Sequence, residues 1–297
     1  MFDRYRVFLF GQRNSAKNGL DQYHIQDSAA ADTQKSALFP FVEQYDKNNC
    51  NCFRKSMCTA CRDVFQTIDN EKPDCCIWEY RSKVRGSRFG TLSFMAKYLH
   101  EHQCDVLFIE HRCCGDSEGK YITFGAKEQW DVQQWAVYVS ERNKEKLPIY
   151  LYGQSMGAAA VLMASGHTLP AEVKGLIADC GFQSMEGQMR DMAANWFHLH
   201  HIPLLLMELD WFCSLLAGFH MKDADTAEAM KKNTRPVLFF HGEKDTYVYP
   251  NNSFQNYMLC RAEKELVIIP GARHLCSAYA DPELYQHKMM EFFEKYD

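Results

Sequence analysis

Residues 147–157 read LPIYLYGQSMG, an apolar run that ends in a turn with Ser155 at its centre. The alanine-rich apolar segment 158–164 follows directly, so the order predicts a strand, a sharp turn and a helix. Such a turn strains its central residue and lifts the serine Oγ clear of the sheet, and Gly153 and Gly157 leave room for the bend. The N-terminus of the following helix favours negative charge at the same point. This stretch therefore predicts that Ser155 is a nucleophile.

Two later turns supply the partners that a nucleophilic serine needs. The apolar run 236–240 predicts a short buried strand, and it leads to a turn that carries Glu243 and Asp245. The apolar run 266–270 predicts another strand and is followed by His274. In folds that place a nucleophilic serine between a strand and a helix, the acid and then the histidine follow later in the chain. The three residues occur here in that order, and each comes after a predicted strand. We predict a Ser155–His274–Asp245 triad, with Glu243 as the alternative acid.

Length and composition indicate one α/β domain that carries an insertion. The chain has 297 residues, of which 46% are hydrophobic and 24% charged, an ordinary globular composition. The formal net charge of −5 argues against a nucleic-acid-binding surface. No apolar run reaches the ~18 residues of a membrane span, and residues 1–4 open no signal-peptide pattern. We therefore expect no membrane span and a cytoplasmic location.

The thirteen cysteines are expected to be mostly free, buried thiols in a reducing compartment. Cys50, Cys52, Cys58 and Cys61 lie within twelve residues, which raises the possibility of a zinc site. Their C-x-C-x₅-C-x-x-C spacing lacks two separated C-x-x-C pairs, so unliganded thiols are favoured. We expect no metal and no cofactor, because acyl transfer at a serine requires neither.

The alternation of apolar segments predicts the architecture from residue 71 to the C-terminus. Strands are expected at 75–78, 105–110, 147–152, 173–179, 236–240 and 266–270, with helices at 94–102 and 127–142. This order predicts a mostly parallel, doubly wound α/β sheet with helices on both faces. Residues 1–70 are left as leading strands or a wrapping extension, and 6–10 as a strand or a helix start.

The rhythm of strands and helices breaks between about residues 182 and 233. The segment is rich in large apolar side chains, and we expect a small helical cap inserted before the strand that leads to the acid. Trp196, Phe197 and Phe212 are candidates for the wall of an apolar acyl or alcohol pocket. Ordinary packing of helices on the sheet is the alternative explanation.

Several motifs resemble those of the α/β-hydrolase superfamily. The segment 110–119, EHRCCGDSEG, is similar to the Arg-Gly-His-Gly-x-Ser-x-Gly turn after the fourth strand in many of its members. Together with the Ser155, Asp245 and His274 turns, the chain from about residue 74 resembles bacterial serine hydrolases with a short cap, of the esterase or serine-aminopeptidase kind. The resemblance implies hydrolysis of a small-molecule carboxylic ester, most simply a carboxylesterase reaction.

The oxyanion of such a reaction would be bound by two backbone N–H groups. Met156, directly after the nucleophile, is one candidate donor, and alignment with the family makes Tyr80 the second. Trp78 and Glu79 stand where the family's third strand usually ends in His-Gly. This difference supports one alternative, a weakly active or inactive binding protein with the same fold. An acyltransferase is a second alternative, and the sequence leaves the oligomeric state open.

Overall fold

The computed structural model of this chain describes a strand near the N-terminus and nearly everything after residue 103. The described residues are 6–12, 95, 98, 99, 102, 104–113, 117 and 119–297, with 6–12, 108 and 110 described by their backbone alone. The interpretation of residues 13–70 and most of the predicted helix 94–102 fall outside this range, and so do three further sets of sequence predictions. They are the strand at 75–78, the oxyanion candidate Tyr80 with its neighbours Trp78 and Glu79, and the cysteine cluster Cys50, Cys52, Cys58 and Cys61.

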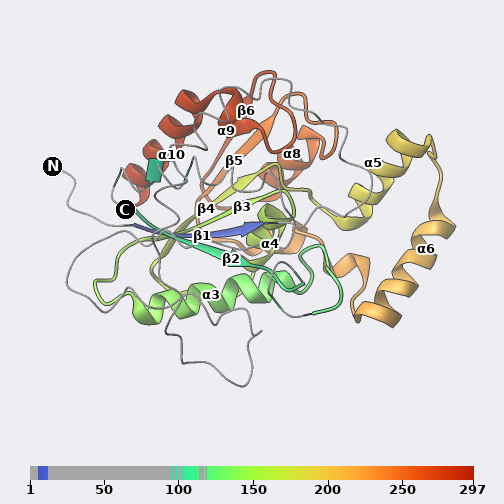
Figure 1. Cartoon of the computed structure of the whole chain (residues 1–297), viewed down its shortest axis with the longest axis horizontal. Helices are drawn as coiled ribbons and strands as arrows, with labels where there is room; N and C mark the ends of the chain where they lie inside the picture. The colour runs from blue at the N-terminus through green and yellow to red at the C-terminus, as the bar shows by residue number, and fades with distance from the viewer. Residues whose placement is uncertain are drawn as a thin grey trace, which may run out of the picture.

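Among the described residues, six parallel strands form one sheet, which confirms the predicted α/β class (Figure 1). Their order across the sheet is β2-β1-β3-β4-β5-β6. The strands are β1 (Arg6–Gln12), β2 (Cys104–Glu110), β3 (Ile149–Gln154), β4 (Val173–Asp179), β5 (Val237–Gly242) and β6 (Lys264–Ile269). The N-terminal apolar run, left open between strand and helix, is a strand that pairs with both β2 and β3.

Helices connect the strands, as parallel pairing requires. The helices are α3 (Glu128–Arg142), α4 (Met156–Ala164), α5 (Met185–Phe197), α6 (Pro203–Phe212), η2 (Cys213–Ala217), η3 (Met221–Asp223), α7 (Ala227–Lys232), α8 (Pro250–Leu259), α9 (Ser277–Ala280) and α10 (Pro282–Tyr296). In Figure 1, α3 and α10 lie on opposite sides of the sheet, so the sheet is covered on both faces.

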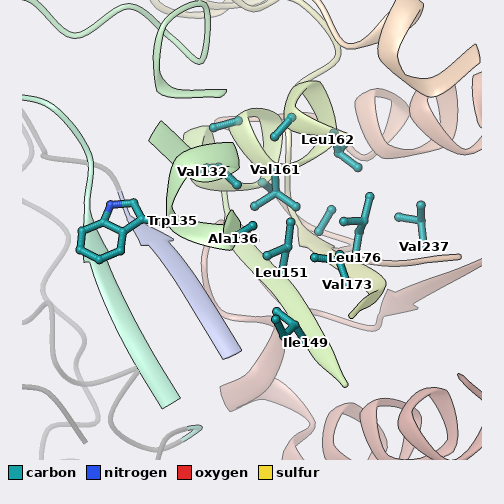
Figure 2. Packing of buried hydrophobic residues seen from close by; sticks show 14 of the residues in the cluster. Val132, Trp135, Ala136, Ile149, Leu151, Val161, Leu162, Val173, Leu176 and Val237 are labelled. Carbon is teal, nitrogen blue, oxygen red and sulfur yellow. The ribbon is translucent and has the colours of Figure 1, made fainter. Parts of the chain in front are cut away.

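Alternate residues of the strands feed two separate cores. Ile149 and Leu151 of β3 pack with α3 and α4, whereas Tyr150 and Tyr152 of the same strand pack with α10. Figure 2 shows the first core, with side chains of α3, β3, α4, β4 and β5 meeting. All six residues of β3 are buried, which is what a strand covered on both faces requires. The strand that precedes Ser155 is therefore fully enclosed within the sheet.

Helix α3 packs on the sheet as its pattern predicts, although not with every apolar residue. Val132, Trp135 and Val139 are buried, whereas Val137 is 39% and Trp130 46% exposed. The Trp130 ring stacks on His167, with ring centroids 3.8 Å apart. Part of the apolar pattern of this helix therefore serves a surface contact with the segment after α4.

The segment between β4 and β5 holds α5, α6, η2 and η3, and we call residues 182–226 the cap. In Figure 1, α5 and α6 stand at one end of the molecule, away from the sheet. Its interior forms a third apolar cluster, which includes Met185, Leu206 and Phe219 and also Met156 of α4. The following helix, α7, buries Met230 in the first core with α3 and α4, and so packs with the body. The cap thus contacts the residue directly after Ser155.

Within the part of the chain that the structure describes, no helix is both long enough and apolar enough to cross a membrane.

We predict that Gly153→Ala destabilises the fold by about 3 kcal/mol. A Cβ at this position would overlap the backbone of Gly157 and Ala158, which neither β3 nor α4 can move away from cheaply. Gly271→Ala is a matched control: its φ is +69° but nothing lies within 4 Å of the added Cβ, so only about 1 kcal/mol of backbone strain is expected. Denaturant unfolding measures both. Equal losses in the two variants would contradict the close approach at Gly153.

Candidate active site

Ser155 occupies the strained turn between β3 and α4 that the sequence predicts. Its φ of 52° and ψ of −118° lie outside the regions that non-glycine residues favour. Its backbone N–H donates to the carbonyl of Asp179 at 2.8 Å, which ties the turn to the end of β4. Ser155 itself is 3% exposed. Two buried strands and a helix therefore hold the serine in a conformation that it would not adopt alone.

His274 lies between Ser155 and Asp245. Its Nε2 is 3.0 Å from the Ser155 Oγ, and its Nδ1 is 2.7 Å from an Asp245 carboxylate oxygen. A carboxylate only accepts hydrogen bonds, so Nδ1 carries the proton and Nε2 is left to accept from the serine hydroxyl. The structure thus brings the three predicted residues, 119 and 29 positions apart in sequence, into one hydrogen-bonded chain.

The Asp245 carboxylate is held at both oxygens. One oxygen accepts from the backbone N–H groups of Tyr247 and Val248, each at 2.9 Å. The other faces His274 and lies 3.3 Å from the Nε2 of His241. Burial acts to raise the pKa of Asp245, but the hydrogen bonds and charges of His241 and His274 outweigh it and lower the pKa to about 2. Asp245 is therefore ionised at neutral pH.

His241 is a buried residue of β5 that the sequence analysis did not single out. Its Nε2 is 2.8 Å from the carbonyl of Val248, and its Nδ1 is 2.7 Å from the Ser253 hydroxyl. Since the carbonyl only accepts hydrogen bonds, Nε2 carries the proton. The ring therefore contacts both the Asp245 carboxylate and the Val248 carbonyl of the turn that follows β5. In the sequence, His241 is recognisable only by its position near the end of a predicted strand, four residues before Asp245. That position does not distinguish a histidine that packs in the core from one that hydrogen-bonds to the acid.

Asp179 anchors the segment that follows His274. Its carboxylate accepts from the Ser277 hydroxyl at 2.8 Å and from the Tyr285 hydroxyl at 3.1 Å, and the Gln154 amide lies at 3.3 Å. Burial is the largest influence on Asp179 and raises its pKa, while these hydrogen bonds act in the opposite direction. Asp179 is the last residue of β4, and its partners link this strand to β3, α9 and α10.

The two predicted oxyanion donors differ in what the structure says of them. Met156 is the first residue of α4 and directly follows Ser155 in the sequence. Its N–H therefore has no acceptor within the helix. Its side chain is buried in the cluster that the cap forms. Tyr80 lies outside the described residues, so its role stays a prediction.

The three cap candidates differ in their exposure and in how they are linked to the triad. Trp196 contacts Tyr247, with ring centroids 5.5 Å apart, and Tyr247 in turn contacts His274, with centroids 4.9 Å apart. Phe197 is 67% and Phe212 49% exposed. Trp196 is therefore one aromatic ring removed from the histidine, and the contribution of all three residues to substrate binding stays a prediction.

Glu243, the alternative acid, points elsewhere. Its carboxylate accepts from the backbone N–H of Gly271 at 2.9 Å, in an exposed turn. The acid that meets His274 is Asp245.

A buried thiol lies beside the acid and the histidine. Cys180, Asp245 and His274 each place a possible metal-ligand atom within 4.8 Å of the others, among the described residues. Burial, and next the charges of Asp179 and Asp245, raise the pKa of the Cys180 thiol well above its usual value. A protonated thiol next to an already formed carboxylate–imidazole hydrogen bond favours acid–base chemistry over metal binding.

Comparison with solved structures identifies the fold as that of the α/β-hydrolases. The esterase Pf2001 of Pyrococcus furiosus matches with a TM-score of 0.54 at 20% identity, over 71% of this chain and 77% of that one. A structure of the metagenome-derived lipolytic enzymes LipS and LipT matches with a TM-score of 0.51 at 16% identity, over 70% and 89% of the two chains.

The chain has the α/β-hydrolase fold. The family described as serine aminopeptidase, S33, matches residues 85–210, a range that contains Ser155 but ends before Asp245 and His274. The uncharacterized protein YqkD of Bacillus subtilis is 27% identical over 67% of this chain and 66% of its own length. The uncharacterized protein YfhR of Escherichia coli is 22% identical over 67% of this chain and 63% of its own length.

We predict that Asp245→Asn removes part of the acid sensitivity of the fold. Because the pKa of Asp245 is about 2 in the folded protein against a usual 3.8, its carboxylate stabilises the fold above about pH 4, and this contribution is lost as the pH falls towards 2. The lost contribution is about 2 kcal/mol. Denaturant unfolding between pH 5 and 2 should show a shallower fall in the free energy of unfolding for the variant. Parallel curves would contradict this assignment.

We predict that Tyr285→Phe costs about 1–3 kcal/mol of stability, since it removes one buried hydrogen bond from the Asp179 carboxylate and one from the Tyr152 hydroxyl. The ring itself stacks on Phe240 with centroids 3.9 Å apart, and phenylalanine keeps that contact. Tyr296→Phe is the matched control, because its hydroxyl bonds to Glu263 at an exposed site and its loss should change stability by less than about 0.5 kcal/mol. Thermal unfolding of both variants compares the two hydroxyls.

Proposed function

We propose that this protein is a serine hydrolase that cleaves carboxylic esters through an acyl-enzyme intermediate. The observation that carries the proposal is the hydrogen-bonded chain from the Ser155 Oγ through His274 to Asp245. A strained, buried serine has no packing reason to face a histidine whose other nitrogen is bound by an ionised carboxylate.

The geometry supports a two-step acyl transfer. His274 takes the Ser155 proton at Nε2 as the Oγ attacks the substrate carbonyl, and Asp245 stabilises the imidazolium that forms. In this mechanism the N–H of Met156, the first residue of α4, donates to the charge that develops on the carbonyl oxygen. His274 then returns the proton to the leaving alcohol. Water, activated by the same nitrogen, attacks the acyl-enzyme and releases the acid.

The relatives favour esters over other acyl compounds. The solved structures that match are named as an esterase and as lipolytic enzymes, and both share the fold at low identity. The apolar residues of the cap that surround Met156 suit an apolar acyl or alcohol group.

The test is covalent labelling with a fluorophosphonate probe, together with hydrolysis of p-nitrophenyl acetate. We expect both in the wild type, and neither in Ser155→Ala or His274→Ala, provided that circular dichroism shows these variants to be folded. A folded wild type that neither labels nor hydrolyses would contradict the proposal and favour the binding-protein alternative.

A matched pair of variants identifies the acid. Asp245→Asn should lower kcat by about 10³–10⁴-fold, because it leaves His274 without the carboxylate that fixes its tautomer. Glu243→Gln should leave kcat within about two-fold, because its carboxylate serves the backbone of Gly271. The reverse result would assign the acid to Glu243.

A further inference from the structure

The cap carries an exposed apolar surface on α6 and η2. We define the outer cap face as Leu204, Leu205, Met207, Trp211, Leu215 and Leu216, whose exposed fractions run from 49% to 69%. With 3.6 residues per turn, positions 204, 207, 211 and 215 form one stripe along the helix, and 205 and 216 lie beside it. Glu208 is a charged residue next to this stripe, and it is also exposed.

The opposite side of the same helix is apolar as well. Leu206 is buried in the cap cluster, and Leu209 and Cys213 pack against it. The other charged residue of α6, Asp210, is engaged by His220 at 2.8 Å and by the backbone N–H of Met221 at 2.6 Å. A surface helix normally turns charged residues outward, and a large exposed apolar patch normally marks an interaction surface. The outer cap face therefore needs an occupant.

The outer cap face follows the end of α5 in the sequence, and the end of α5 is linked to the triad. Trp196 and Phe197, at the C-terminal end of α5, are 46% and 67% exposed. The Trp196 ring contacts Tyr247, which contacts His274. Two aromatic rings thus lead from the exposed end of α5, which precedes the outer cap face in the sequence, to the histidine that meets Ser155. An occupant that also contains the substrate makes use of this link, whereas a second protein copy on this face would obstruct it.

The chemistry of the face also favours a lipid surface. It holds tryptophan, leucine and methionine and no lysine or arginine, whereas protein interfaces surround their apolar centre with hydrogen-bonding groups and are enriched in arginine. The helix pair stands out at one end of the molecule (Figure 1), a convex shape that suits shallow insertion. The connection between α5 and α6 exposes His198, His200 and His201, polar side chains suited to the headgroup level.

We propose that the outer cap face docks on a lipid surface and that the substrates of Ser155 are apolar esters drawn from that surface. The substrate class rests on the proposed function, while the docking itself does not require catalysis. Docking places the ester next to Trp196 and Tyr247, and a substrate that stays in the aggregate until it reaches His274 avoids transfer through water.

The docking test uses the Ser155→Ala protein and flotation with phosphatidylcholine vesicles, so that it is independent of hydrolysis. We expect the protein to float with the vesicles. Adding Leu204→Gln, Met207→Gln and Leu215→Gln should lower the bound fraction at least ten-fold. The matched control is Phe254→Gln with Met258→Gln on α8, which removes side chains that are 51% and 62% exposed and should leave flotation unchanged.

The kinetic test uses the protein with Ser155 intact. The triple variant should hydrolyse soluble p-nitrophenyl acetate at the wild-type rate but lose at least ten-fold in rate on p-nitrophenyl palmitate in mixed micelles. Normal flotation without any ester hydrolysis would overturn the proposed function and leave the docking standing. Hydrolysis of the soluble ester without flotation would do the opposite.

Two other occupants give distinct results, and each overturns the docking proposal. A second copy would appear as a dimer in light scattering that the triple variant converts to a monomer, with no flotation of either. Coverage by another part of the chain would appear as a lower melting temperature of the triple variant, again without flotation.

Discussion

The close approach of β3 and α4 is the constraint on which the site depends. Gly153 lies against the backbone of the first turn of α4, and no side chain fits between them. The chain therefore reverses direction within one residue, and that residue, Ser155, takes a positive φ of 52°. Strain of this kind costs on the order of 1–3 kcal/mol and persists only where the surroundings fix it. Here the surroundings are a fully buried strand and an entirely buried helix.

The serine alone would achieve little without a fixed histidine, and two carboxylates fix it in different ways. Asp245 is kept ionised by His241 and His274, so it offers a charge to the imidazole. Burial raises the pKa of Asp179 instead, and its oxygens serve as acceptors that join Ser277 and Tyr285 to the sheet. One carboxylate thus supplies charge and the other supplies position, and both follow the ends of neighbouring parallel strands.

The sequence predicted the sheet and the triad because both depend on local patterns. Apolar runs of strand length mark β3, β4, β5 and β6, and the order of Ser155, Asp245 and His274 follows from the fold that such a turn belongs to. The supports were harder to predict, because His241 and Tyr285 look like ordinary strand and helix residues until distant segments meet. The cap was recognised as apolar, but composition does not indicate which side of a helix faces the body, so the exposure of Phe197 and Phe212 was not foreseen.

Tyr247 is where the polar site and the apolar cap meet. The backbone N–H of Tyr247 donates to the Asp245 carboxylate at 2.9 Å. The Tyr247 ring contacts His274 and also contacts Trp196 of the cap. A displacement of α5 would therefore change the contact between Trp196 and the Tyr247 ring, which lies against His274. The hydrogen bond from the Tyr247 N–H would still keep the Asp245 carboxylate in place. The fold gains nothing from the exposed apolar side chains of α6, since the buried side of that helix already packs the cap. Those side chains are therefore available for the proposed contact with a lipid surface.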